Sequence, residues 1–527
     1  MKVLITDSLD PVCPELLEAA GITPVVQLKK SPEELKALAA DADGWIVRSG
    51  TQITADLLDA APNLRVIGRA GVGVDNIDLE AATRRGVLVL NAPDGNTIST
   101  AEHTCAMMLA LMRQIPQAAA SLKGGAWERA PFSGAELDGK TLGIIGVGKI
   151  GREVAKRMQA FGMRTVGFDP VLSTETAERL GVDLVDLDTL FAESDVITVH
   201  APLNDATRHL INKEALSRCR DGVRIVNCAR GGIVDEADLL EGLESGRVGG
   251  AALDVYSQEP PPAGLAGLIR HPRVVTTPHI AASTGEAQAK VARQVTEQVI
   301  EALHDRPVAT PVNAGAIRAA AQPEARPFID LADRLGQVVG QITDGHVRRV
   351  TVGCYGETAR RYAEVLAVAA LRGLLARWSD EPVNLINAPA LAREMGLRVE
   401  EKRHSEPADF TNLVEVALET DAGARSVKGT VLSDDEPRLV GLDHFRFEAK
   451  PEGHLLFYQN VDRPGMLATV GGILAEAGIN IASLALGRDR QGETALTAIS
   501  VDEGVPAEVV RRIRAIEGVE DVRVVHV

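Results

Sequence analysis

Arginine, glutamate and histidine side chains stand in three short segments at the ends of apolar runs. Arg230 is followed by two glycines, Glu259 by two prolines, and His279 follows Pro278. In α/β enzymes, side chains at strand ends are the ones presented to a ligand. Arginine holds a carboxylate through two parallel hydrogen bonds, histidine moves a hydroxyl proton, and glutamate orients the histidine. The three residues together therefore indicate redox chemistry at a hydroxyl beside a carboxylate.

A glycine pattern upstream of these segments indicates the oxidant. The pattern Gly-x-Gly-x-x-Gly occupies residues 146–151, between a predicted strand (141–145) and a predicted helix (153–161). A second predicted strand at 165–168 ends at an acidic residue. This is the dinucleotide fingerprint, in which glycines allow the turn and the approach of the pyrophosphate, and the acidic residue holds the ribose. The predicted cofactor residues are Gly146, Gly148, Gly151 and Asp169.

Asp169 also bears on the choice between NAD and NADP. Its carboxylate would repel a 2′-phosphate, and no arginine or lysine occurs in residues 170–172. We therefore predict NAD. The alternative is a structural glycine turn in some other α/β fold.

Composition favours a cytoplasmic enzyme of several domains. The chain has 527 residues, enough for three or four domains, and a net charge of −17, which argues against binding to nucleic acid or to an anionic membrane. Five scattered cysteines without a C-x-x-C pattern indicate reduced thiols and no metal site. No signal peptide or membrane-spanning run is predicted.

The order of predicted elements gives an α/β multidomain chain. A flavodoxin-like substrate-binding domain (residues 1–97 and 284–310) is expected to contain an inserted Rossmann NAD-binding domain (98–283), because a helix predicted at 285–304 would cross back to the first domain. A mixed α/β intervening regulatory domain (311–452) and a ferredoxin-like βαββαβ domain (453–527) would follow. Residues 306–327, rich in Ala and Pro, are predicted to be a linker.

Several longer phrases carry a resemblance to a known family. Residues 68–78, 113–116, 227–232 and 278–279 resemble the D-isomer-specific 2-hydroxyacid dehydrogenases, and the last 75 residues resemble an ACT domain. The combination is similar to the long-form branch of that family, which oxidises 3-phospho-D-glycerate to 3-phosphohydroxypyruvate with NAD at the start of serine biosynthesis. The resemblance also places further residues near the cofactor: Lys149 and Ile150 at the pyrophosphate, and Cys228, Ala229, Arg230, Asp254 and His279 at the nicotinamide.

The chemistry assigns a role to each catalytic candidate. His279 would take the C2 hydroxyl proton while hydride leaves C2, and Glu259 would fix the tautomer of the imidazole and favour its protonated form. Arg230 would hold the C1 carboxylate. Taken singly, the histidine would be assigned to a core and the glutamate to a solvated turn; their joint occurrence favours catalysis.

A substrate phosphate needs cationic groups and free amides. The predicted contacts follow two strands of the first domain: Arg48, Ser49, Arg69, Gly71, Val72 and Gly73. Arg129, from a neighbouring subunit, is a weaker candidate. The alternative is that these arginines only cap carbonyls or pair with carboxylates. His103 and His200 are predicted to be structural, or, for His200, to line the cofactor pocket.

The resemblance of the tail implies an amino-acid effector, with L-serine expected at Asn460, Asp462 and Asn480. Asn460 stands where relatives often have an aromatic or imidazole side chain. The alternative is a domain kept only for oligomerisation, and a homo-oligomer (dimer or tetramer) is expected in either case.

Two other functions stay open at this point. One is a hydroxypyruvate or glyoxylate reductase, or another D-2-hydroxyacid dehydrogenase, that ignores the phosphate. The other is an NAD-sensing regulatory or co-repressor protein on the same scaffold.

Overall fold

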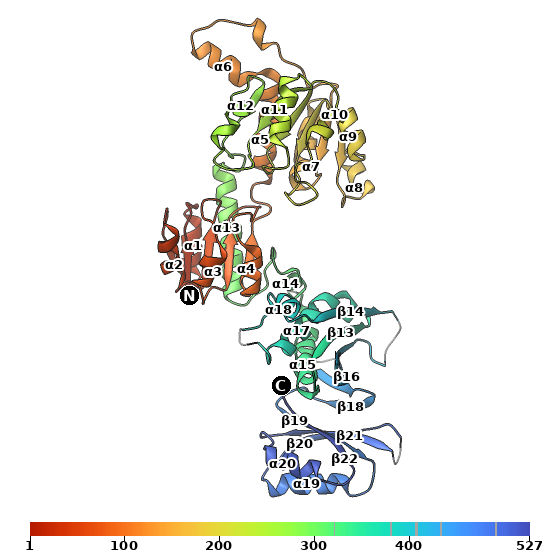
Figure 1. The fold of residues 1–527 in the computed structure, drawn as a ribbon. Helices are drawn as coiled ribbons and strands as arrows, with labels where there is room; N and C mark the ends of the chain where they lie inside the picture. The colour runs from red at the N-terminus through yellow and green to blue at the C-terminus, as the bar shows by residue number, and fades with distance from the viewer. Residues whose placement is uncertain (321, 380–381, 406–408, 433–434, 491–492) are drawn as a thin grey trace. The chain divides into compact units, whose positions relative to one another are not determined.

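The computed structural model describes residues 1–320, 322–379, 382–405, 409–432, 435–490 and 493–527 (Figure 1). The chain divides into two compact units. One consists of Met1–Ser8, Pro14–Asn91 and Val295–Val527, and the other of Leu9–Cys13 and Ala92–Gln294. Across the described ranges, no helix has both the length and the apolar character needed to cross a membrane.

The first unit begins with a parallel five-stranded sheet. Its order β2-β1-β3-β4-β5 is the flavodoxin-like order, because the first strand is flanked by the second and third. The strands are β1 Lys2–Ile5, β2 Thr23–Val26, β3 Gly44–Val47, β4 Val66–Arg69 and β5 Leu88–Asn91, and the helices between them are α1 Val12–Ala19, α2 Pro32–Ala39, α3 Ala55–Asp59 and α4 Leu79–Arg84.

Helix α13 (Gly285–Leu303) packs on this sheet through its C-terminal half. A Cβ on Gly68 in β4 would lie 2.7 Å from the Val299 side chain and 2.8 Å from that of Val295. Gly68 therefore allows the helix to approach the strand closely. At its apolar centre the sheet buries the whole side chain of Trp45, whose indole N–H donates to the hydroxyl of Thr6 over 3.0 Å.

The second unit contains a parallel seven-stranded sheet in the order β12-β11-β10-β9-β6-β7-β8. This is the Rossmann order. From β6 the sheet extends to β7 and β8 on one side and to β9 and the later strands on the other, so the order in which strands are added reverses between β6 and β9. The strands are β6 Thr141–Ile145, β7 Arg164–Phe168, β8 Asp183–Leu184, β9 Val196–Val199, β10 Val223–Asn227, β11 Val248–Leu253 and β12 Val274–Thr276. The helices are α5 Thr97–Arg113, α6 Ile115–Lys123, η1 Ala130–Phe132, α7 Lys149–Ala160, α8 Thr174–Arg179, α9 Leu187–Glu193, α10 Lys213–Arg218, α11 Glu236–Glu244, η2 Ala263–Leu265 and α12 Ala266–Ile269.

The predicted linker at 306–327 is structured, so that prediction was wrong for its described residues; residue 321 lies outside them. Pro311 forms a bridge with Leu90, and the Val312 amide donates to the Val89 carbonyl over 2.8 Å. The segment extends the edge of the first sheet and then forms α14 Gly315–Ala320 and η3 Pro323–Ala325. Alanine and proline suggested a linker, but a proline at a sheet edge loses no hydrogen bond to a neighbouring strand.

The intervening region is a mixed six-stranded sheet in the order β14-β13-β15-β16-β17-β18, parallel only between β13 and β14. Helices α15 and α17 share its apolar core. The strands are β13 Val347–Tyr355, β14 Arg398–His404, β15 Leu413–Thr420, β16 Gly423–Val431, β17 Pro437–Leu442 and β18 Phe445–Ala449; the helices are α15 Arg326–Ile342, α16 Glu357–Arg361, α17 Ala363–Leu375 and α18 Ala388–Glu394.

The C-terminal region is an antiparallel sheet in the order β20-β21-β19-β22, with the predicted βαββαβ sequence of elements. In β19, Leu456 and Tyr458 face the helices, whereas Leu455 and Phe457 belong to the core of the intervening region. Strand β19 is thus buried on both faces, whereas most of β20 is exposed. Its elements are β19 His454–Val461, α19 Met466–Glu476, β20 Ile481–Arg488, β21 Thr494–Val501, α20 Ala507–Arg514 and β22 Val519–His526.

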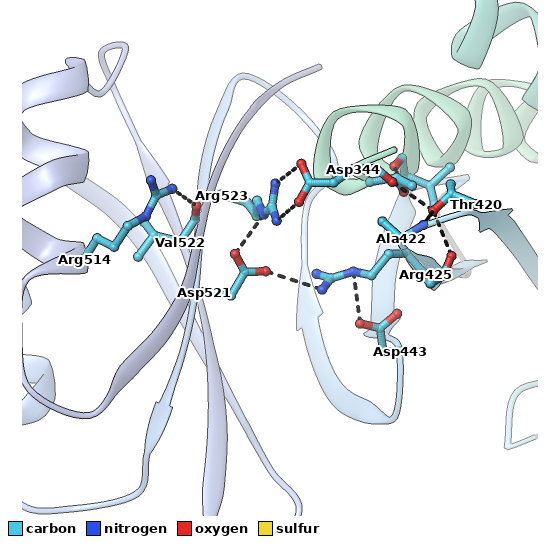
Figure 2. Close-up of polar contacts among 12 residues, drawn as sticks. Asp344, Thr420, Ala422, Arg425, Asp443, Arg514, Asp521, Val522 and Arg523 are labelled. Atoms are coloured by element: carbon cyan, nitrogen blue, oxygen red, sulfur yellow. Dashed lines mark hydrogen bonds and ion pairs between the residues drawn. The ribbon is translucent and has the colours of Figure 1, made fainter. Parts of the chain in front are cut away.

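Ion pairs join β22 to the intervening region (Figure 2). Arg523 binds Asp344 through both terminal guanidinium nitrogens and Asp521 through Nε over 2.8 Å. Asp521 also pairs with Arg425 at 3.3 Å. The hydrogen bond from Arg523 lowers the pKa of Asp344 below its ordinary value. The two parallel sheets, the mixed sheet and the antiparallel sheet together confirm the predicted α/β multidomain fold class.

Candidate active site

Three glycines shape the loop between β6 and α7. Gly146 has a φ of +90°, and a Cβ there would lie 2.7 Å from the His200 carbonyl oxygen. A Cβ on Gly151 would lie 2.2 Å from the Gly146 carbonyl oxygen. Gly148 is the N-cap of α7, and a Cβ on it would meet no described atom within 4 Å. Packing does not require glycine at 148, which fits a backbone that a ligand approaches.

Two predicted pyrophosphate contacts open helix α7. Lys149 and Ile150 are its first residues, and the amides of a first helical turn have no partner inside the helix. Together with the helix dipole, such amides bind anions. The Lys149 ammonium pairs with Asp94.

Asp169 follows β7 and holds the neighbouring loops together. Its Oδ2 accepts from the Val147 amide over 2.9 Å, and its Oδ1 accepts from the Val171 and Leu172 amides over 2.9 and 3.1 Å. A carboxylate accepts about four hydrogen bonds, so one acceptor position remains for a ribose hydroxyl. The predicted ribose contact is therefore compatible with the bonds that Asp169 already makes.

The loop after β10 presents Arg230. Asn227, the last residue of β10, accepts from the Ala229 amide over 3.0 Å and donates to the Arg230 carbonyl over 2.9 Å. A Cβ on Gly231 would lie 1.8 Å from the Tyr256 carbonyl oxygen, so the loop packs tightly against the residues after β11. These contacts fix the backbone from which the guanidinium extends.

His279 and Glu259 come together as predicted. Imidazole Nδ1 lies 2.6 Å from Glu259 Oε2, and the His279 amide donates to the Asp254 carbonyl over 2.8 Å. With a proton on Nδ1 shared with the carboxylate, Nε2 is the acceptor of the neutral ring. The His279 side chain is 42% exposed and the Glu259 side chain 36%, so the pair is open to a ligand.

The environment keeps Glu259 ionised. Burial acts to raise the pKa of Glu259, but the hydrogen bond and charge of His279 and the Tyr256 amide hold this pKa below its ordinary value. An ionised glutamate stabilises the imidazolium that forms when His279 takes a proton. The pair is suited to general base catalysis in one direction and general acid catalysis in the other.

Asp254 has a role that the sequence did not reveal. Its fully buried carboxylate accepts from the Thr277 hydroxyl over 2.5 Å and from the amides of Ile280 and Ala281 over 2.9 and 3.0 Å. It also lies 3.4 Å from Nε2 of His103. Burial acts to raise the pKa of Asp254, but these hydrogen bonds lower it. Asp254 therefore anchors the turn that carries His279.

Cys228 and His200, both in the second unit, are neutral groups. Burial raises the pKa of Cys228 to about 12, so its thiol is not a nucleophile. Burial lowers the pKa of His200 to about 4, and its Nε2 lies 3.0 Å from the Thr198 hydroxyl. Both suit the lining of a pocket better than acid–base chemistry.

The structure brings the predicted phosphate contacts of the first unit to one sheet edge. Arg48 directly follows β3, and Arg69 ends β4, in register with the last residue of β3. The Ala70 amide donates to the Val47 carbonyl over 2.7 Å, which ties the two strand ends together. Gly71, Val72 and Gly73 follow, and Asn91 donates to the Val72 carbonyl over 2.7 Å. The two segments are thus neighbours, as the strand order requires.

The three predicted effector residues lie at or beside the ends of strands β19 and β20. Asn460, in β19, is 4% exposed, and its Oδ1 accepts from no donor in the described ranges. Asp462 pairs with Arg488 at 3.2 Å, and Asn480 donates to Asp502 over 2.6 Å.

Relatives match this chain from end to end. The D-3-phosphoglycerate dehydrogenase of Methanocaldococcus jannaschii is 41% identical over 527 residues, which cover 100% of both chains. The D-3-phosphoglycerate dehydrogenase of Homo sapiens is 44% identical over 506 residues, covering 94% of this chain and 93% of that protein. The chain belongs to the D-3-phosphoglycerate dehydrogenase family. The family resemblance expected from the motifs is confirmed.

Family models identify three regions of this D-3-phosphoglycerate dehydrogenase family member. The NAD binding domain of D-isomer specific 2-hydroxyacid dehydrogenases matches residues 105–281, the D-3-phosphoglycerate dehydrogenase intervening domain 324–443, and the ACT domain 454–518. The chain is an NAD-dependent oxidoreductase with a domain type that binds small-molecule effectors.

Solved structures agree over the catalytic part. A glyoxylate reductase from Paecilomyes thermophila is 31% identical, with a TM-score of 0.55, covering 59% of this chain and 98% of that one. A D-lactate dehydrogenase from Aquifex aeolicus, complexed with NAD and lactic acid, is 30% identical, with a TM-score of 0.52, covering 57% of this chain and 96% of that one.

Proposed function

We propose that this enzyme oxidises 3-phospho-D-glycerate to 3-phosphohydroxypyruvate with NAD, the first step of the phosphorylated route to L-serine. The hydrogen bond of 2.6 Å between His279 and Glu259, in a domain with the Rossmann strand order, is the observation that carries the redox chemistry. The names of the full-length relatives support the phosphorylated substrate.

The oxidation removes a hydride from C2 and a proton from the hydroxyl oxygen on C2. His279 takes the hydroxyl proton on Nε2 while Glu259 holds the proton on Nδ1. The C2–H electron pair leaves as hydride, and the C2–O bond becomes a carbonyl. NAD, which the glycine loop and Asp169 would hold, would supply the acceptor for this hydride. In reduction, the imidazolium of His279 returns the proton to the carbonyl oxygen.

Two groups of arginines would orient the substrate. Arg230 holds the C1 carboxylate with its planar pair of donors, which fixes C2 for hydride transfer. Arg48 and Arg69, with the amides of the segments that follow them, hold the phosphate.

NAD reduction by the purified protein tests this function. With 3-phospho-D-glycerate we expect turnover with NAD and far slower turnover with NADP, because Asp169 would repel the 2′-phosphate. The L enantiomer at equal concentration is the control for stereospecific positioning. Absence of turnover with every substrate and both cofactors would contradict the proposal and favour an NAD-sensing regulatory protein.

We also propose that L-serine binds the ACT domain at Asn460, Asp462 and Asn480. The buried Asn460 Oδ1, which accepts from no donor in the described ranges, supports a polar ligand at the end of β19. We expect L-serine, and not D-serine, to raise the melting temperature, and Asn460→Leu to abolish the shift. An equal shift by both enantiomers, or one that survives Asn460→Leu, would contradict this site.

A homo-oligomer belongs to the same proposal. Apolar side chains on and after α6 are exposed: Ile115 by 54%, Leu122 by 57% and Trp127 by 80%. Exposed apolar groups of this size favour burial against another subunit. Arg129 lies two residues after Trp127 in the same segment. In such an oligomer, Arg129 would contact the substrate that a neighbouring subunit binds.

A further inference from the structure

Asp7 lies directly against the segment that carries Arg48. It follows β1, and its Oδ2 accepts from the Arg48 amide over 2.6 Å and from the Thr51 amide over 3.2 Å. Its Oδ1 accepts from the Thr51 hydroxyl over 3.1 Å. A Cβ on Gly50 would lie 2.6 Å from the same Oδ1, so the backbone of residue 50 is in contact with the carboxylate.

Asn76 binds the same segment through the opposite backbone groups. Its side chain is buried, with the residue 8% exposed, and Nδ2 donates to the Arg48 carbonyl over 2.7 Å and to the Thr51 carbonyl over 2.6 Å. The backbone carbonyl of Asn76 accepts from the Ile53 amide over 2.8 Å. Asp7 therefore takes the two N–H groups, and Asn76 the two C=O groups, of residues 48 and 51.

The middle of the segment stays available. Ser49 and Gly50 are exposed, and their amides donate to no acceptor in the described part of the chain. Adjacent free amides, next to the Arg48 side chain and the Ser49 hydroxyl, are donors that suit an anion. Both ends of residues 48–51 are thus fixed while the donors between them face solvent.

We infer that Asp7 and Asn76 are positioning residues that hold residues 48–51 in the shape that binds the substrate phosphate, and that they thereby set the preference for a phosphorylated substrate. This inference rests on the proposed function. Donors fixed before binding lose little conformational freedom when the ligand arrives, so the contacts strengthen binding more than mobile donors would.

The direction in which one substitution changes phosphate binding distinguishes a positioning role of Asp7 from a purely electrostatic one. Asp7 carries a negative charge close to a predicted phosphate site, and in a purely electrostatic view its removal would strengthen phosphate binding. Asp7→Ala removes the charge together with the acceptor of the Arg48 and Thr51 amides. Positioning therefore predicts weaker phosphate binding, and electrostatics alone predicts stronger binding.

The experiment measures kcat/KM with NADH for 3-phosphohydroxypyruvate and for hydroxypyruvate, and compares their ratio. Asp7→Ala and Asn76→Ala are each expected to lower the ratio about tenfold, mainly through the KM of the phosphorylated substrate. Asp78→Asn is the matched control, because Asp78 caps α4 through the Ala81 amide at 2.9 Å and asparagine caps equally well. Its ratio should equal that of the unchanged protein.

Three outcomes overturn the inference. They are an unchanged or increased ratio in Asp7→Ala, an equal loss with both substrates, and an unchanged protein that itself shows no phosphate preference. Only the last of these outcomes also contradicts the proposed function. If either variant unfolds, it is replaced by Thr51→Val, which deletes the hydroxyl that binds Asp7 and Thr6. A ratio equal to that of the unchanged protein then overturns the inference.

Discussion

Replacing His279 with asparagine is expected to lower kcat by about 10²- to 10⁴-fold, the usual contribution of a general acid–base residue. Asparagine cannot take the C2 hydroxyl proton, but it tolerates the left-handed backbone of this position, where φ is +54°. NADH binding, followed by fluorescence, should be unchanged within about threefold, because the glycine loop and Asp169 do not depend on the imidazole.

His209 is the matched control for this substitution. It also has a left-handed backbone, with a φ of +50°, and its Nδ1 lies 3.2 Å from Asp235. His209→Asn thus removes a second histidine–carboxylate pair of the same domain and should leave kcat within about twofold. A His279→Asn enzyme that keeps more than about a tenth of the original kcat would contradict the assigned base.

Replacing Arg230 with glutamine should lower kcat/KM for 3-phosphohydroxypyruvate by about 10²-fold, or about 3 kcal/mol, because a two-donor bond to the C1 carboxylate is lost. Arg230→Lys keeps the charge but not the planar fork, so a loss of about tenfold is expected. The measurement is initial-rate kinetics of NADH oxidation in each variant.

Arg220 provides the comparison for Arg230. It precedes β10 at the other end of the same strand, is 52% exposed and pairs with Asp195 at 3.4 Å. Arg220→Gln should change kcat/KM by less than about twofold, since an exposed ion pair contributes little. Equal losses in the Arg220 and Arg230 variants would indicate a general effect on the domain and contradict the carboxylate contact.

Local patterns predicted the parts of the site that depend on short stretches of chain. Gly146 and Gly151 each have a backbone or packing reason that their spacing already implied, whereas Gly148 leaves room for a ligand to approach the backbone. The start of α7 was predicted at residue 153 because apolar periodicity begins at Val154, but the helix starts at Lys149, directly after the glycine N-cap. Periodicity detects the buried face of a helix and not its first turn.

Contacts between distant residues could not be predicted in this way. Asp7 and Arg48 are 41 residues apart, Asn76 and Arg48 are 28 apart, and Asp254 and Thr277 are 23 apart. These partners meet only because neighbouring parallel strands end at the same edge of a sheet. An aspartate after a strand indicates a polar edge, but its partners follow from the order and register of the strands.

Reduction of 3-phosphohydroxypyruvate and of hydroxypyruvate by the unchanged protein, measured side by side with NADH, tests the proposed function most directly. Two charge-assisted contacts to the phosphate, each of about 1.5–3 kcal/mol, predict a preference in kcat/KM well above tenfold for the phosphorylated substrate. Equal kcat/KM values for the two substrates would contradict the phosphate site and leave a general 2-hydroxyacid dehydrogenase.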